Sequence, residues 1–121
     1  MSAALAYLPA QCTHVVKLTG KYFSPALPPY LNSLSVNLPT LALQSRGPSY
    51  YGWSSELFII SRRLLAAQMH TRVRSFGRTE EWLSYIRKTL MAVNVSVHYL
   101  PRFPLARSVY RSGDNALMTW L

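Results

Sequence analysis

Three observations predict a small, irregular, mainly α-helical protein. Six of the eight prolines fall within residues 1–52. Two later segments repeat apolar residues at helical spacing, and one short run alternates with a period of two. We therefore expect an extended proline-rich N-terminal arm at 1–52 and an amphipathic helical hairpin at 53–92. One short strand and an arginine- and aromatic-rich C-terminal arm are expected at 93–121.

The proline-rich segment is expected to stay extended. Proline fixes its own φ and pushes the residue before it to extended geometry, so 24–30 is predicted to be polyproline-like. Residues 31–38 alternate roughly between apolar and polar side chains, which is compatible with a short edge strand. Such a segment has no core of its own to offset its ordering entropy. An ordered arm would therefore lie along a partner chain.

Two segments carry the apolar stripe of an amphipathic helix. In 53–71 the stripe predicts a first helix, with Ser54 or Ser55 as its N-cap. In 79–92 it predicts a second helix, with Thr79 as N-cap and two glutamates beside the positive end of the helix dipole. The short turn between two amphipathic helices favours a helical hairpin.

Residues 93–99 switch to a period of two, which is a strand pattern that Pro101 ends. As the one strong strand of the sequence, it is expected to pair with a partner's sheet or with the weaker segment 34–38. Residues 116–121 are expected to form a short C-terminal helical turn capped by Ser112. The apolar tip of that turn would be buried in a neighbouring molecule.

The net positive charge of the chain results from a shortage of acidic residues. Thirteen Lys and Arg face four Asp and Glu, which gives a net charge of +9 and a pI near 10.2. The bases alone are about 11% of the chain, close to half of the total charge of an ordinary domain, while the acids are several-fold scarcer than usual. Half of the residues are apolar, and a disordered tail would have a lower apolar content. The composition thus predicts a partner that supplies negative charge.

Ten of the thirteen bases lie between residues 62 and 111. They are expected to contact RNA phosphates, the head groups of an anionic lipid such as cardiolipin, or an acidic protein surface. The alternative is the solvated polar face of two amphipathic helices. These residues are Arg62, Arg63, Arg72, Arg74, Arg78, Arg87, Lys88, Arg102, Arg107 and Arg111.

A second set of side chains is expected to pack against partner subunits. Part of it lies in 99–111, where rings alternate with arginines. Such a strip can stack on bases while it binds phosphate. The alternative is an extended peptide whose rings dock in protein pockets. The predicted packing residues are Tyr30, Leu34, Val36, Tyr99, Phe103, Tyr110 and Trp120.

No pattern in the sequence points to catalysis, a metal or a cofactor. Cys12 and His14 resemble half of a zinc site, but the other possible ligands are scattered along the chain. The five glycines are isolated, so no glycine-rich phosphate loop is present. The single cysteine excludes an internal disulfide and fits a reducing compartment or an organelle interior.

These observations favour a non-catalytic accessory subunit of a large mitochondrial membrane assembly, such as a respiratory-chain complex or ATP synthase. Low charge, many Tyr and Trp, and the expected arms suit a subunit that contacts several others. The prolines within 22–45 argue against a membrane span there, so a peripheral place at the inner membrane is expected. The alternative is an organellar ribosomal protein that binds rRNA. The sparse Lys and Arg of residues 1–45 count against that alternative.

Overall fold

The structure is a computed structural model that describes residues 8–20, 22–34, 37–47, 52–110 and 117–121, and of 70–75 the backbone alone. Over these residues the chain forms three helices and two sheets, of four and two strands. This is a mixed α/β fold, so the expectation of a mainly α-helical protein is wrong. The reason is that segments expected to be arms or helices pair as strands.

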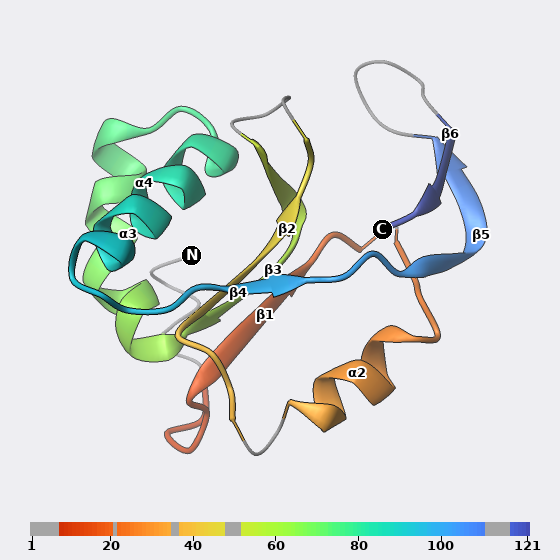
Figure 1. The fold of residues 1–121 in the computed structure, drawn as a ribbon, viewed down its shortest axis with the longest axis horizontal. Coiled ribbons are helices and arrows are strands. Elements are labelled where there is room, and N and C mark those ends of the chain that lie inside the picture. The colour runs from red at the N-terminus through yellow and green to blue at the C-terminus, as the bar shows by residue number, and fades with distance from the viewer. Residues whose placement is uncertain (1–7, 21, 35–36, 48–51, 111–116) are drawn as a thin grey trace.

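The larger sheet has four strands in the order β1-β3-β2-β4 (Figure 1). These strands are β1 (His14–Leu18), β3 (Trp53–Ser61), β2 (Leu41–Ser45) and β4 (His98–Leu100). β3 pairs antiparallel with both β1 and β2, whereas β2 pairs parallel with β4. Two strands of this sheet come from 1–52, so the expectation of an extended arm without packing of its own is wrong.

β3 lies where the first helix was expected. Residues 57–60 are all at most 1% exposed, because β3 has a paired strand on each side and packed side chains on both faces. A strand buried on both faces is apolar at every position. Its sequence therefore also contains apolar residues at the spacing of an amphipathic helix. The helix predicted over 53–71 therefore begins nine residues later than expected, at Arg62.

α3 (Arg62–Ser75) and α4 (Thr79–Ala92) form a helical hairpin against one face of the sheet (Figure 1). Ser61 caps α3, because its hydroxyl accepts a hydrogen bond of 3.1 Å from the Leu64 N–H. The prediction of a helix at 79–92 is confirmed, with both glutamates in its first turn. Its N-cap is the residue before Thr79, so that detail of the prediction is wrong.

α2 (Leu27–Ser33) occupies the segment that was expected to be polyproline-like and then extended. Pro28 and Pro29 stand in its first turn. There the backbone N–H groups lack intrahelical acceptors, so proline costs no hydrogen bond and its fixed φ suits a helix. Leu27 is buried and Leu31 packs beside it, so α2 is held by burial of its apolar side.

β5 (Pro104–Tyr110) and β6 (Leu117–Trp120) form a separate antiparallel sheet of two strands. The expected C-terminal helical turn is therefore wrong over 117–120, while residues 112 and 116 lie outside the described part of the chain. A reciprocal pair of backbone hydrogen bonds, 2.9 and 2.7 Å long, joins Phe103 to Leu121 beside this sheet. Pairing with β5 thus supplies partners for polar backbone groups on one side of β6.

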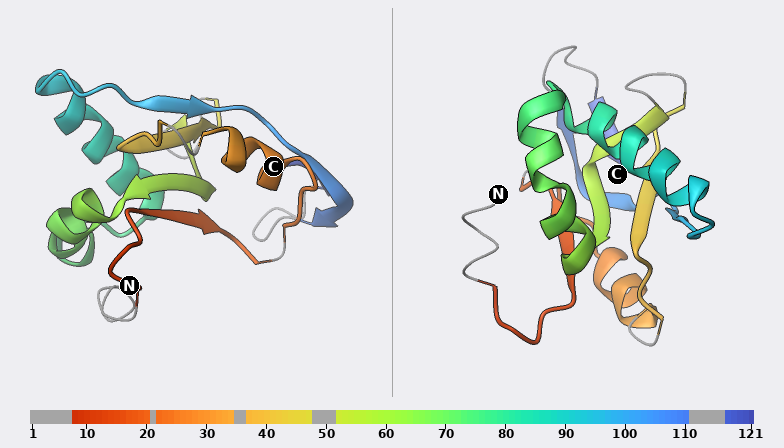
Figure 2. Two further views of the ribbon diagram at one scale, coloured as in Figure 1. Left: turned by 90° about the horizontal axis from the view of Figure 1, so that it is seen from below. Right: turned by 90° about the vertical axis from the view of Figure 1, so that its left-hand side faces the viewer.

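Two apolar cores lie on opposite faces of the four-stranded sheet. The first is filled by sheet residues such as Phe58 and by Trp82 and Ile86 of α4. The second is filled from α2 and from the residues around the β5–β6 sheet, including Phe103 and Leu121. Figure 2 shows α3 and α4 grouped at one side of the sheet. The four-stranded sheet thus takes strands from all three of the segments distinguished in the sequence.

No described helix is long and apolar enough to cross a membrane.

Candidate anion-binding site

A pocket of about 280 Å³ opens where the end of β2, the β4–β5 connection and β6 meet. Gln44 and Arg46 come from the end of β2 and Arg102 from the connection, while residues 117–121 form the opposite wall. Among the described lining residues none has an acidic side chain. The guanidinium groups of Arg46 and Arg102 thus belong to the lining of a cavity whose described side chains include no carboxylate.

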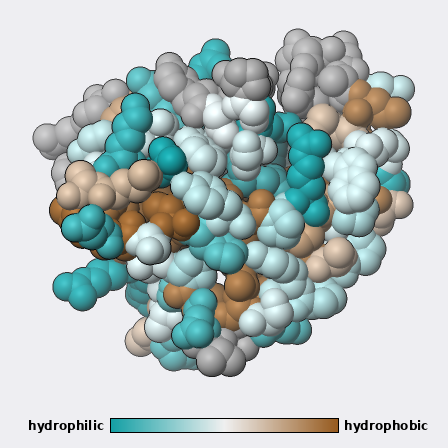
Figure 3. Space-filling view, viewed as in Figure 1, coloured by the Kyte–Doolittle hydropathy of each residue, from teal (hydrophilic) through white to brown (hydrophobic). Residues whose placement is uncertain are grey.

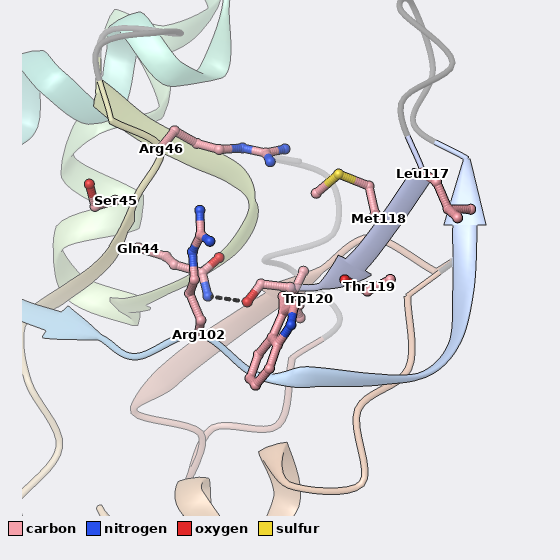
Figure 4. A pocket seen from close by; sticks show the side chains of 9 residues that line it. Gln44, Ser45, Arg46, Arg102, Leu117, Met118, Thr119 and Trp120 are labelled. Carbon is pink, nitrogen blue, oxygen red and sulfur yellow. Dashed lines mark hydrogen bonds between the residues drawn. The ribbon is translucent and has the colours of Figure 1, made fainter.

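Gln44 fixes the walls of this pocket relative to one another. Its side chain is 4% exposed, and its amide nitrogen donates to the carbonyl oxygen of Leu121 at 2.8 Å (Figure 4). The same nitrogen donates to the carbonyl oxygen of Pro101 at 2.9 Å. One buried side chain thereby joins β2 to the segments on both sides of β5–β6. Sequence reasoning missed Gln44. The available signal was a polar residue directly after the apolar run at 41–43.

Arg46 stands at the start of the β2–β3 turn. Its backbone N–H donates to the Gly52 carbonyl at 2.9 Å, which closes the described ends of the turn. Gly47 and Gly52 both have positive φ, at 70° and 84°, a conformation that glycine adopts without a Cβ clash. Figure 4 shows the half-buried Arg46 side chain extending along the pocket towards Met118. Arg46 was not expected at a binding site, because it lies outside the cluster of bases at 62–111.

Arg102 is exposed between two buried neighbours, Leu100 at 7% and Phe103 at 3% exposed. These neighbours anchor the connection in the second core, and they hold the Arg102 backbone beside the pocket. Arg102 makes no hydrogen bond or ion pair with the described part of the chain. A guanidinium presents planar donors that match phosphate or carboxylate in two-point contacts. Arg46 and Arg102 together therefore suit an anion.

The opposite wall supplies apolar surface. Trp120 is 50% exposed and lies opposite Pro104 in the β5–β6 register, while Met118 is half-buried opposite Val109. In Figure 4 the Trp120 ring lies beside the Arg102 side chain at the pocket. An indole ring held by a strand offers a flat face for stacking on another ring.

Among those of the ten bases expected to contact an anion whose side chains the structure describes, Arg102 alone lines this pocket. Arg62 instead donates to the backbone oxygen of Pro9 at 2.6 Å, so it holds the N-terminal segment against α3. Four others are exposed elsewhere on the surface. The side chains of 72 and 74, and residue 111 entirely, lie outside the description. The four exposed bases are Arg63, Arg78, Lys88 and Arg107.

Arg87 belongs to a cluster of rings beside α4. Its guanidinium carbon lies 5.0 Å from the Trp53 ring centroid, and its Nε donates to the Tyr99 hydroxyl at 3.1 Å. The Trp53 and Tyr99 rings stack at 5.7 Å. Their strands, β3 and β4, are separated by β2. Arg87 thus helps to cover this edge of the sheet, which is an internal role.

The residues expected to pack on partners divide into two groups. Tyr30, Leu34 and Phe103 pack in the second core of this chain. Tyr30 also contacts Phe103 edge to face at 5.2 Å. The remaining described residues are between 50% and 67% exposed, and residue 36 lies outside the description. These exposed residues are Tyr99, Tyr110 and Trp120.

Among the residues that the structure describes, two titratable groups have a shifted pKa. Burial lowers the pKa of Lys17, and the charges of Glu56 and Glu80 partly oppose this by raising it. The Lys17 ammonium donates to the Thr19 hydroxyl at 2.7 Å and to the Ser55 carbonyl, so it serves the β1–β3 pairing. Burial raises the pKa of Tyr30, whose hydroxyl lies 2.8 Å from Nε2 of His98.

Cys12 and His14, the residues considered for a zinc site, are not part of a metal-binding cluster among the described residues. Cys12 is half-buried, and His14 hydrogen-bonds to the Thr13 hydroxyl at 2.9 Å. No group of three or more His, Cys, Asp or Glu that could hold a metal ion occurs among the residues described.

Comparison with known protein families, with characterised proteins and with solved structures finds no match for this chain. The chemistry of the pocket and of the surface around it is therefore the basis on which a function can be argued.

Proposed function

We propose that the chain is a non-catalytic protein that binds single-stranded RNA, in the manner of an organellar ribosomal or other RNA-associated protein. One observation carries the proposal: Arg46, Arg102 and the half-exposed Trp120 line one pocket that contains no acidic side chain among its described residues. Arginine binds backbone phosphate, and an exposed indole stacks on a base, so this combination suits unpaired nucleotides.

The remaining surface supports the same partner. The net charge of +9 attracts a polyanion over the whole molecule. Further exposed arginine and aromatic side chains, Arg107 and Tyr110, lie on β5 itself. The earlier objection to RNA was the sparse charge of residues 1–45, which were expected to be the binding arm. Since β1, α2 and β2 pack within the domain, they are not needed as such an arm.

The salt dependence of RNA binding tests this proposal. For a labelled single-stranded RNA, log K falls with log salt by about 0.7 for each phosphate contact neutralised. We expect the double variant Arg46→Gln, Arg102→Gln to bind more weakly at low salt and to lose about 1.4 from that slope. Fluorescence anisotropy measured over a potassium chloride series gives both quantities.

The double variant Arg63→Gln, Arg78→Gln is the matched control. It removes the same charge from exposed positions that do not line the pocket, so we expect it to keep more of the binding. Equal losses in the two double variants would mean that the pocket has no special role. Absence of RNA binding by the unaltered protein at low salt would refute the proposal.

A second candidate is an accessory subunit of a mitochondrial membrane assembly that contacts anionic lipid. Large apolar side chains are exposed at the end of α4, where Met91 is 50% and Val93 64% exposed, and Phe23 is 64% exposed elsewhere. Figure 3 includes hydrophobic side chains at the surface on the side of α3 and α4. Co-sedimentation with cardiolipin vesicles that depends on Met91 and Val93, without RNA binding, would favour this candidate.

A further inference from the structure

We propose that the outer edge of β1 pairs with β1 of a second copy of this chain, so that the four-stranded sheets of the two copies become continuous. This inference goes beyond the proposed RNA binding and does not depend on it. β1 is an edge strand of the sheet, and in the left view of Figure 2 it has β3 on one side only. No described segment pairs with its other side.

The backbone of β1 presents unpaired hydrogen-bonding groups at this edge. The Arg62 N–H donates to the Thr13 carbonyl at 2.8 Å, and the Thr19 N–H donates to a β3 carbonyl at 3.0 Å. In an antiparallel pair, residues that bond to the neighbouring strand alternate with residues whose N–H and C=O groups point away. The even-numbered residues of β1 therefore turn both groups to the open edge, where no described residue bonds to them. These residues are His14, Val16 and Leu18.

β1 lacks the features that usually protect the edge of a sheet from further pairing. Natural edges are protected by proline, by very short strands, by bulges or by outward-pointing charge. At the opposite edge, β4 has three residues and Pro101 directly follows it. β5 begins with Pro104, and its register with β6 is shifted. β1 has five residues, no proline and an unbroken register with β3, so it is the least protected of these edges.

Lys17, the lysine of β1, is held within its own sheet. Its ammonium donates to the Thr19 hydroxyl at 2.7 Å and to the Ser55 carbonyl on β3. Glu56 and Glu80 lie close enough for their charges to act on it. A lysine that projected from the edge would repel a second positively charged strand, but this ammonium is bound and partly neutralised. It therefore does not protect the edge.

β1 is complementary to a second copy of itself. An antiparallel pair of β1 strands with Val16 on the two-fold axis brings His14 of one copy opposite Leu18 of the other. These are all hydrogen-bonded pairs, so every outward N–H and C=O group at the edge finds a partner. The Val16 side chain, which is 41% exposed in one chain, then lies against its copy. Lys17 stands opposite Val15 of the second copy, so no two lysines face each other.

The size and charge of the contact determine how the dimer should behave. A pair of five-residue strands is a small interface, below the roughly 800 Å² per partner of a standard one, so we expect a weak and reversible dimer. Each copy carries a net charge of +9, so the copies repel each other and salt should strengthen the dimer by screening. RNA binding should weaken over the same salt series, which separates the two properties.

Sedimentation of the full chain, freed of nucleic acid, over about 1 μM to about 1 mM protein tests the inference. We expect the dimer fraction to rise with protein and with salt. Val16→Pro should weaken the dimer about tenfold, because the two symmetry-related N–H groups at its centre are lost. This N–H does not bond to β3, so proline is compatible with the folded monomer. Val16→Thr keeps the N–H and should keep the dimer.

Val16→Lys tests the same edge without proline. It places two lysines opposite each other on the two-fold axis, so it should weaken the dimer several-fold at low salt and less at high salt. Val93→Lys makes the same change of charge at another exposed valine, at the end of α4, and is the matched control. A dimer that is insensitive to Val16→Pro and to Val16→Lys would overturn the inference.

Amide hydrogen exchange identifies what covers the edge. The outward N–H groups of His14, Val16 and Leu18 should exchange more slowly as the protein concentration rises. Slow exchange in a chain that stays monomeric would place another segment of the same chain at the edge. Fast exchange in a chain that stays monomeric would leave the edge to a strand of another protein. Either result overturns the inference, and neither bears on RNA binding.

Discussion

At the scale of single residues, the side chains of Gln44 and Tyr30 make buried or half-buried polar contacts that connect parts of the chain far apart in sequence. Gln44 joins β2 to Pro101 and Leu121, and Tyr30 joins α2 to His98 on β4. Neither contact has a local sequence signature, because each partner is more than 50 residues away. A buried hydrogen bond of this kind matters mainly through the cost of leaving its partner unsatisfied.

Tyr30→Phe tests the contact of α2 with the sheet and carries a pH dependence. Loss of the hydrogen bond to His98 should cost about 0.5–1.5 kcal/mol of unfolding free energy at neutral pH. The folded state raises the pKa of Tyr30 above its ordinary value of 10.0, so above that pH the unfolded state loses the proton first. The contribution of Tyr30 to stability is therefore full below about pH 10 and is lost as the pH rises through the raised pKa.

Urea unfolding between about pH 8 and about pH 11 checks this sign. The difference in stability between the unaltered protein and Tyr30→Phe should shrink at the alkaline end. Lys17 changes stability in the opposite direction just below 10.5, because its pKa is lowered on folding, and this effect is common to both proteins. Tyr110→Phe removes the hydroxyl of an exposed ring and is the control. A difference that grows with pH would contradict the assignment.

At the scale of elements, the boundary between β3 and α3 decides how the centre of the chain folds. β3 ends and α3 begins at adjacent residues, so Ser61 is both the last strand residue and the N-cap. Its backbone N–H donates to the Thr40 carbonyl at 2.8 Å, while its hydroxyl accepts from Leu64. One serine thus connects sheet pairing to helix initiation.

Ser61→Ala should lower the free energy of unfolding by about 1 kcal/mol, because one N–H in the first turn of α3 loses its acceptor. The backbone bond to Thr40 remains, so the sheet pairing should be unchanged. Ser96→Ala, at an exposed position between α4 and β4, is the matched control and should change stability by less than about 0.5 kcal/mol. Chemical denaturation measures both, and equal effects would show that the cap contributes nothing.

Local signals predicted some elements and misled on others. α4 was predictable because its apolar stripe, its acidic first turn and its length all agree with a helix on one face of a sheet. β3 was not, because complete burial removes the alternation that marks a strand. α2 was missed because prolines in the first turn of a helix have the same local sequence pattern as prolines in a polyproline segment.

The candidate site was partly predictable. Arg102 and Trp120 were identified from the sequence as an anion contact and a packing residue, and they line the same pocket. Arg46 and Gln44 were missed, because their places follow from the β2–β3 turn and from the docking of the β5–β6 sheet. A residue type can suggest a contact, but the neighbour across the pocket comes from pairing between distant segments.

At the scale of the whole molecule, the sheet with a core on each face changes the expected behaviour of the isolated chain. The composition suggested a polypeptide that partners must complete by packing. Two apolar cores that share β3 instead favour a domain that folds by itself. Residues of β3 alternate between the cores, so disruption of one core should propagate to the other.

Leu57→Ala in the second core and Ile86→Ala in the first test this coupling, since both residues are at most 1% exposed. Each variant should lose about 2–5 kcal/mol from the same single urea transition. Tryptophan fluorescence and far-UV circular dichroism should give coincident midpoints for the unaltered protein and for each variant. Two separate transitions, or no cooperative transition for the unaltered chain, would show that the cores are not one unit.

The sequence by itself determined the charge excess, the helix at 79–92 and the exposed placement of several arginines. These are local or compositional properties, which depend on each segment's own residues. The strand that it predicted at 93–99 is wrong over 93–97, because only His98–Leu100 pairs, and its partner is β2 rather than 34–38. Only the tertiary structure decided that β1 and β2 join β3, that the C-terminal segment is a strand, and which arginines share a pocket. Strand pairing satisfies backbone groups and buries both faces of β3 through contacts between remote residues, and no local pattern specifies which remote partner is chosen.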